Sequence, residues 1–485
     1  MSRARLAMVL GLGARPFFVL AAAWAVVAVG VWPAVFAGTL ALPGAFAPVD
    51  WHAHELIFGY GGAVVAGFLL TAIANWTGRP PVAGLRLGAL VLAWLVARVV
   101  VAVLPPSPGL AVGLVFPLGL LGLAGWEILA AGNARNRKVI GILVLLVLAD
   151  AGFTLAVAQG WDTGLAQRGG LAVLVLLILL IGGRVTPAFT RNWLQRNGMA
   201  APVAAFDRLD AAGMGLAGLA LPGWVGWPEA RLTALPLALA GVVGLARLAR
   251  WQGWAARRDL LLVVLHGGYG LAVLGFLAAA GHAGWPDWLP LAAVVHIWAV
   301  GAVGMTTAAM MTRATLGHTG QALRADGWMA GMYGGLLAAL LARVGMALWP
   351  DNSAWLLWLA VGCWCAAFAL FLGRFAPALL AGPRGPGGTR SPGRCFLCSY
   401  REAAILPMMA GCCERGAFDP VVHPVAAGAG QADPAGADCA RLWADAARQG
   451  GCAAGGAYAG GAGRCAGADL GRAGGAAGQG AGGGR

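Results

Sequence analysis

The chain has 485 residues, of which 60% are hydrophobic and only 11% are charged. Soluble domains are about 45–50% apolar and about 25% charged, so this composition excludes a soluble globular enzyme, a disordered chain and an ordinary DNA-binding domain. The formal net charge of +14 would suggest nucleic acid as the partner of a soluble protein. In a membrane protein the same charge records which loops face the cytoplasm, so the positions of the basic residues decide between the two interpretations.

Runs of about 20 apolar residues are long enough to cross a bilayer as helices. The segments that meet this requirement lie at 16–38, 54–76, 87–104, 109–131, 139–158, 169–187, 209–226, 232–249, 260–281, 289–311, 327–348 and 353–373. We therefore expect an all-α, polytopic helical membrane bundle of about twelve transmembrane helices, formed by residues 1–380.

Basic residues gather at alternate ends of these segments. Before residue 381, 19 of them lie on one side of the expected bundle and two lie on the other, while Arg98 and Arg343 fall inside apolar runs. Because basic residues mark the cytoplasmic side, we expect both termini in the cytoplasm. The net charge then reflects topology, so the expected surroundings are the lipid bilayer and no nucleic acid is expected as a partner.

The composition changes abruptly after residue 380. Residues 381–485 hold 26 of the 78 glycines and seven of the nine cysteines, and they contain no apolar run of spanning length. Gly/Ala/Arg-rich low complexity of this kind need not form a packed core, so we expect a disordered tail. The tail also resembles GC-rich DNA translated out of frame, which suggests a frameshift near Pro377–Arg390. A metal-binding or redox tail is the alternative, from Cys395 and Cys398.

Histidines in the membrane domain are the first candidates for chemistry, because imidazole is the commonest protein ligand for metals and suits copper, iron and zinc. Their expected depths form two groups: His52, His54 and His296 near the periplasmic side, and His266 and His318 near the cytoplasmic side. If both lie on a helix, His52 and His54 point to different faces. For each histidine, the alternative is a hydrogen-bonded structural role.

Two charged residues are expected within the membrane. Arg98 and Asp150 each lie about twelve residues from the cytoplasmic ends of their helices. Equal depth permits an ion pair, which would lower the cost of burying either charge. A proton path is the alternative.

Several segments together resemble the NnrS family of membrane proteins. They are RPFF at 15–18, WHAHE at 51–55, NWTGRPP at 75–81, GGRVTPAFTRNW at 182–193, LHGGY at 265–269, the stretch from His296 to Gly304, and MTRATLGHTG at 311–320. The similarity runs from about Arg15 to Leu380. It implies a multi-pass protein of the bacterial inner membrane that contains haem and copper. It also implies a role in the response to nitric oxide and the relief of nitrosative stress, often alongside denitrification, with nitric oxide or nitrosyl species as partners.

The resemblance leaves open which histidine binds which metal and whether a substrate is turned over. The candidate metal ligands are His52, His54, His266, His296 and His318. His266 and His318 are also the candidate haem ligands, with Arg79, Arg184 and Arg191 on the cytoplasmic side as partners for haem propionates.

Two other classes of protein stay possible on the sequence alone. Twelve helices are common among secondary transporters, and Asp150 would be the residue that couples transport to protons. A distant relative of the haem-copper oxidases or nitric oxide reductases is the second alternative. The chain lacks the adjacent His-His pair and the His-Pro-Glu segment expected of that group.

Overall fold

The structure is a computed structural model, and it describes residues 3–44, 46–105, 111–199 and 202–381. Within these ranges the chain forms helices and no strand. The expectations for the tail after residue 381, including the frameshift, lie outside the described residues.

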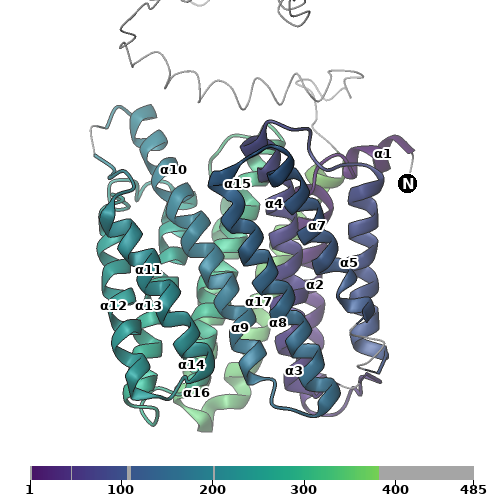
Figure 1. The fold of residues 1–485 in the computed structure, drawn as a ribbon, viewed down its shortest axis with the longest axis vertical. Helices are drawn as coiled ribbons and strands as arrows, with labels where there is room; N and C mark the ends of the chain where they lie inside the picture. The colour runs from purple at the N-terminus through teal and green to yellow at the C-terminus, as the bar shows by residue number, and fades with distance from the viewer. Residues whose placement is uncertain (1–2, 45, 106–110, 200–201, 382–485) are drawn as a thin grey trace, which may run out of the picture. The chain divides into compact units, whose positions relative to one another are not determined.

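The helices follow one another in chain order and lie side by side as a bundle (Figure 1). Those of the first half are α1 (Arg3–Val9), α2 (Ala14–Phe36), α3 (Pro48–His54), η1 (Glu55–Tyr60), α4 (Gly61–Thr77), α5 (Leu85–Val103), α7 (Val115–Ala130), η2 (Ala134–Asn136), α8 (Arg137–Gln159), α9 (Gly164–Leu177), η3 (Ile178–Gly182) and α10 (Gly183–Arg196). Those of the second half are α11 (Arg208–Gly226), α12 (Arg231–Ala249), α13 (Leu260–Gly284), α14 (Leu291–His296), η4 (Ile297–Gly304), α15 (Met305–His318), α16 (Gly327–Leu348), η5 (Pro350–Asn352) and α17 (Ser353–Ala381).

Eleven helical stretches of the described chain are long and apolar enough to cross a membrane, which confirms the predicted all-α, polytopic bundle. Three of them are composite: Pro48–Thr77, Gly164–Arg196 and Leu291–His318. In each, an α-helix continues into a π-helix (η1, η3 or η4) and then into a second α-helix. These composite stretches are longer than the predicted segments, because polar flanking sequence continues the helix instead of forming a loop.

The predicted count of twelve exceeds this number by one helix. The predicted segment 209–226 forms α11, but Arg208, Asp210 and the glycines of this helix lower its hydropathy, and it is not among the eleven. Even so, α11 is as long as its neighbour α12, at 19 residues each, and it packs against both α9 and α12. The cytoplasmic placement of the termini stays a prediction.

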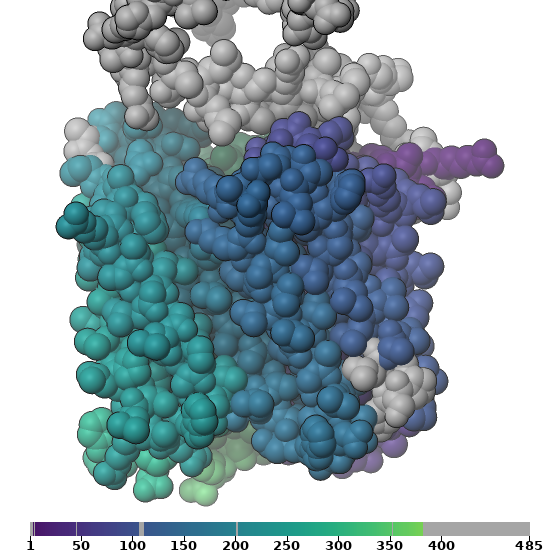
Figure 2. All heavy atoms as spheres, viewed as in Figure 1, coloured from purple at the N-terminus to yellow at the C-terminus, as the bar shows by residue number. Residues whose placement is uncertain are grey.

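Apolar side chains cover the outside of the bundle as well as its interior. Exposed large apolar residues include Leu92 in α5, Leu148 in α8, Leu219 in α11 and Val242 in α12. Figure 2 shows one outer face of the bundle, to which α8, α9 and α11 contribute side chains. Such an outer surface is stable in contact with lipid, because exposing apolar groups to lipid tails lacks the free-energy cost of exposing them to water.

Tight packing fixes η4 against α13. The indole of Trp298, in η4, is fully buried and donates a hydrogen bond to the Ala272 carbonyl oxygen at 2.9 Å. A Cβ atom at Gly275 would lie 2.1 Å from the Trp298 Nε1 atom, so only glycine leaves room for this ring. This contact holds in place the composite helix that carries His296.

Candidate functional site

A cavity of about 450 Å³ lies among α2, α3, α9, α14, α16 and α17. Most of its lining is apolar, and the π-helices η1 and η4 contribute Ile57, Tyr60 and Val303 to it. Besides the aromatic Trp32, Tyr60 and Trp364, its polar side chains are His52, His296, Arg343, Gln167 and Arg168. The structure therefore brings together two of the three histidines predicted on the periplasmic side.

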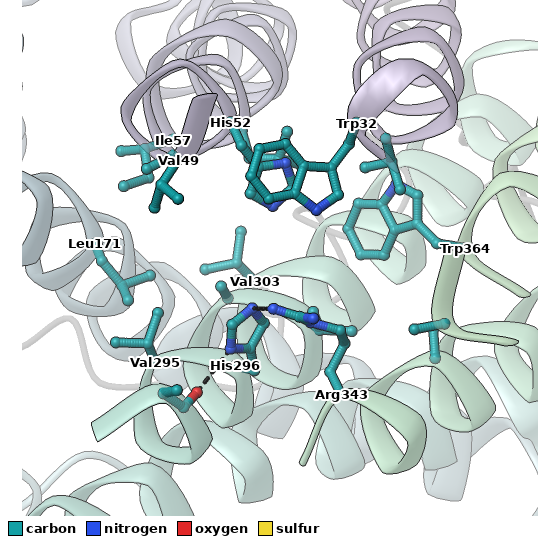
Figure 3. A pocket seen from close by; sticks show the side chains of 18 of the residues that line it. Trp32, Val49, His52, Ile57, Leu171, Val295, His296, Val303, Arg343 and Trp364 are labelled. Atoms are coloured by element: carbon teal, nitrogen blue, oxygen red, sulfur yellow. Dashed lines mark hydrogen bonds between the residues drawn. The ribbon is translucent and has the colours of Figure 1, made fainter. Parts of the chain in front are cut away.

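His296 has a partner on each ring nitrogen. Its Nδ1 atom lies 2.6 Å from the Ala292 carbonyl oxygen, and Arg343 Nη2 lies 2.7 Å from its Nε2 atom (Figure 3). An arginine only donates, so Nε2 must be the accepting nitrogen, and the proton of a neutral ring sits on Nδ1 and is donated to Ala292. His296 thus acts as a neutral base that orients Arg343.

His52 differs from His296 in the surroundings of its ring. The ring stacks on Trp32 with centroids 4.3 Å apart and planes 26° apart. Its Nδ1 atom is buried and has no hydrogen-bond partner among the described residues. In Figure 3 the rings of His52 and Trp32 are drawn across the cavity from His296 and Arg343. His52 is therefore the imidazole in this cavity that is free to bind a ligand.

His54 belongs to a separate, fully buried cluster of charged side chains. Its Nδ1 lies 3.1 Å from Glu55 Oε1 and its Nε2 lies 2.9 Å from Asp150 Oδ1. Arg98 Nη1 donates to Glu55 Oε2 at 2.7 Å. His52 and His54 point to different sites, as their spacing predicts. Because both ring nitrogens of His54 face carboxylates, this ring has no free position for a metal.

The expected direct pairing of Arg98 with Asp150 is wrong. Both residues belong to the same cluster, but Glu55 and His54 stand between them. Glu55 was not a predicted partner, although it follows His54 directly. Its position could have indicated the pairing, because Glu55 is a third ionisable residue in an apolar segment and charges within a membrane are nearly always paired.

The π-helices begin directly after two of these histidines. Glu55, the first residue of η1, follows His54, and Ile297, the first residue of η4, follows His296. A π-helical turn contains an extra residue, so every later side chain rotates relative to a continuous α-helix. This rotation decides which residues of α4 and α15 face the interior, and π-helical turns of this kind are frequent at functional sites.

A second, smaller cavity of about 80 Å³ lies beside α4, η3 and α15. It shares Leu174 and Val303 with the larger cavity. Tyr60, which lines the larger cavity, and Thr307, which lines the smaller one, share a hydrogen bond of 2.6 Å between their hydroxyl oxygens. These contacts make the two cavities neighbours along the interior of the bundle.

The predicted histidines of the cytoplasmic side line neither cavity. His266 Nδ1 lies 2.9 Å from the Leu262 carbonyl oxygen, and its Nε2 lies 3.5 Å from the Thr190 hydroxyl. The ring also packs against Gly253, where a Cβ atom would lie 2.6 Å from it. His318, at the end of α15, lies within electrostatic range of Arg15.

The three predicted cytoplasmic arginines each contact a different part of the protein. Arg79 pairs with Glu127 at 2.5 Å. Arg184 donates to the Asn136 side chain at 3.4 Å, and Arg191 donates to the Val203 carbonyl oxygen at 3.5 Å. None of the three lines either cavity.

The sequence also predicts metal coordination by several histidines. Among the residues that the structure describes, no group of three or more His, Cys, Asp or Glu side chains is arranged to hold a metal ion. The larger cavity instead offers a single unpartnered imidazole in apolar surroundings, opposite an arginine held by a histidine.

Comparison with models of known protein families gives a match over most of the chain. The sequence model described as NnrS protein matches residues 8–384, which include all the helices named above from α2 to α17. No curated protein matches the chain. The matched region extends over most of the 485 residues, and the chain therefore belongs to the NnrS family.

Proposed function

We propose that this protein acts in the response to nitric oxide in the bacterial inner membrane, where it relieves nitrosative stress as a haem-bearing protein. The observation that carries this proposal is the His52 imidazole, which lines an apolar cavity of about 450 Å³ and has a buried nitrogen without a partner. Membership of the NnrS family supports the same proposal.

The residues of the larger cavity fit a haem group. Its volume lies within the range of about 300–1,000 Å³ that is usual for cofactor sites, and its walls are mostly apolar. His52 would supply a nitrogen to bind the iron of a haem, and Arg343 would supply a cationic partner for its carboxylates. When bound, haem would supply an iron centre able to bind nitric oxide.

The side chains around His52 define what the protein itself contributes. Trp32 holds the His52 ring by stacking and fixes its plane. Val29, Val300 and Leu357 belong to the apolar wall of the cavity. Nitric oxide is small and apolar, so it can reach such a cavity from the lipid without a polar channel.

The described residues do not fit a copper site. His54 has a carboxylate on each ring nitrogen, and the two nitrogens of His296 are taken by Ala292 and Arg343. A copper ion would have to displace these partners, and Arg343 would add a positive charge beside it. We assign copper to no residue and derive no step from it.

The test is an optical spectrum of the detergent-purified, full-length protein, with and without nitric oxide. We expect a Soret band that shifts with nitric oxide, is lost in His52→Ala, and persists in His282→Ala. His282 is a suitable control because it also has a buried nitrogen without a partner, its Nε2, but lines neither cavity. Its Nδ1 is bonded to the Leu289 carbonyl oxygen at 2.8 Å. An unaltered size-exclusion profile shows that each variant is folded.

Two results would contradict the proposal in different ways. Wild-type protein without a Soret band would remove haem from the proposed function. A band that survives in His52→Ala and disappears in His266→Ala would move the haem to the cytoplasmic side, where His266 and His318 lie.

A further inference from the structure

Arg343 is a half-buried cation in a membrane-spanning helix, and it lacks an acidic partner among the described residues. Within that part of the chain its guanidinium contacts the His296 Nε2 atom at 2.7 Å and the Met346 sulfur at 2.8 Å, and both groups are neutral. No carboxylate within the described ranges forms an ion pair with it. A charge held away from water is costly unless it is paired, so this position calls for a negative group.

Other arginines inside the bundle show what Arg343 lacks. Arg98 pairs with Glu55 at 2.7 Å, and Arg247 pairs with Asp210 at 2.9 Å. Arg168, which also lines the cavity, lies near Asp162 and Glu229. Of the two arginines that line the cavity, Arg343 is therefore the one without a carboxylate nearby in the described part of the chain.

The geometry of Arg343 suits a carboxylate. Its guanidinium uses one N–H for His296 and one for Met346, which leaves donors on Nε and on both terminal nitrogens. A planar guanidinium with free neighbouring donors binds a carboxylate by two parallel hydrogen bonds. His296 holds this plane at the edge of the cavity, across from His52 in Figure 3.

We propose that Arg343, positioned by His296, binds a carboxylate of the ligand in the larger cavity. The apolar walls require the rest of that ligand to be apolar. This inference rests on the proposed function in one respect, because with haem as the ligand the carboxylate is a propionate. His52 and Arg343 would then hold the group at two different points, the iron and a propionate.

The test compares haem with its dimethyl ester, in which both propionates are esterified and uncharged. Each is titrated into full-length apoprotein in detergent and followed by the Soret absorbance. We expect wild-type protein to bind haem at least about tenfold more tightly than the diester, because hydrogen bonds to charged groups contribute more than neutral ones. The wild-type comparison does not depend on whether any variant folds.

Substitutions then assign the preference to one residue. In Arg343→Leu the preference for haem over the diester is expected to disappear, whereas Arg343→Lys is expected to keep part of it. Arg231→Leu removes an exposed arginine at the start of α12, outside the cavity, and is expected to leave the ratio unchanged. Equal binding of haem and diester by wild-type protein, or an unchanged ratio in Arg343→Leu, would overturn the inference.

A second probe separates this inference from the proposed function. If wild-type protein binds neither porphyrin, haem is not the ligand, and a fluorescent polyene fatty acid and its methyl ester replace the porphyrins. Preference for the free acid that is lost in Arg343→Leu would support a carboxylate site for an acyl ligand. Equal binding of acid and ester, or no binding of either, would overturn the inference.

Discussion

Glu55 lies between two cationic side chains that come from different helices. It accepts from Arg98 of α5 and contacts His54 of α3, and all three side chains are buried. A neutral imidazole has a single N–H, yet His54 faces a carboxylate with each nitrogen. The cluster therefore holds an additional proton, and a doubly protonated His54 would balance two carboxylates with two cations.

This balance predicts non-additive substitutions. Glu55→Gln and Arg98→Met should each destabilise the protein by about 3–5 kcal/mol, because each leaves one charge buried without a partner. The double variant removes an ion pair and should cost less than the sum of the two single changes, since His54 and Asp150 still balance each other. Thermal unfolding in detergent, followed by tryptophan fluorescence, measures this double-mutant cycle.

Strict additivity of the two changes would contradict the balanced cluster. The sequence places His52, His54 and Asp150 in the membrane and separates the faces of the two histidines, because these features depend only on helix geometry. Which charges pair cannot be obtained in this way, since contacts between α3, α5 and α8 depend on how those helices are arranged in space.

At the scale of the helix, α16 begins with a charged cap. The Asp326 side chain accepts from the Met329 backbone N–H at 3.1 Å, and Arg374 of α17 donates to it at 2.6 Å. Burial alone would raise the pKa of Asp326, but the hydrogen bonds from Arg374 and Met329 hold this pKa below its usual value. The ionised cap thus fastens α16 to α17.

The lowered pKa of Asp326 fixes the sign of a pH effect. Ionised Asp326 stabilises the folded protein above the unfolded-state pKa, and this stabilisation is lost as the pH falls through the lower folded-state pKa. We expect Asp326→Asn to lower the melting temperature at neutral pH, and the difference from wild type to shrink below about pH 4. Asn still caps the helix, so the change isolates the charge.

An exposed aspartate provides the control for this measurement. Asp351→Asn alters a residue between α16 and α17 for which the described contacts include no ion pair, and it should change the melting temperature little at any pH. A difference between Asp326→Asn and wild type that stays constant down to acidic pH would show that the carboxylate charge is not what matters.

Helix positions follow well from the sequence, whereas helix type does not. Apolar length predicts the segments, and every one of the twelve except 209–226 lies close to a span of the structure. The π-helices η1, η3 and η4 interrupt segments that are apolar on nearly every face, so no periodic pattern marks the extra residue. Apolar length also misses helix ends that are polar, as at α10, which continues to Arg196 beyond the predicted end at residue 187.

For the whole molecule, the open question of topology depends on α11. Asp210 is the residue that makes this helix less apolar, but Arg247 of α12 donates to it at 2.9 Å and both are buried. Arg247 also donates to the Tyr269 hydroxyl at 2.8 Å. Pairing of this kind lowers the cost of placing the carboxylate in the membrane, so we expect α11 to cross it.

A crossing by α11 places the segments on either side of it in different compartments. Single cysteines at Asn197→Cys, after α10, and Glu229→Cys, between α11 and α12, report the two sides in a background where the nine native cysteines are replaced by serine. A membrane-impermeant maleimide applied to intact spheroplasts should label Glu229→Cys only. Both should react after permeabilisation, which is the control for accessibility.

Equal labelling of both positions before permeabilisation would mean that α11 does not cross. The chain would then have an odd number of crossings, and the segments before and after α11 would face the same compartment. The alternation of basic residues argues against that outcome, because it places the arginines around α12 and α13 on the same side as those of α10 only if α11 spans the membrane.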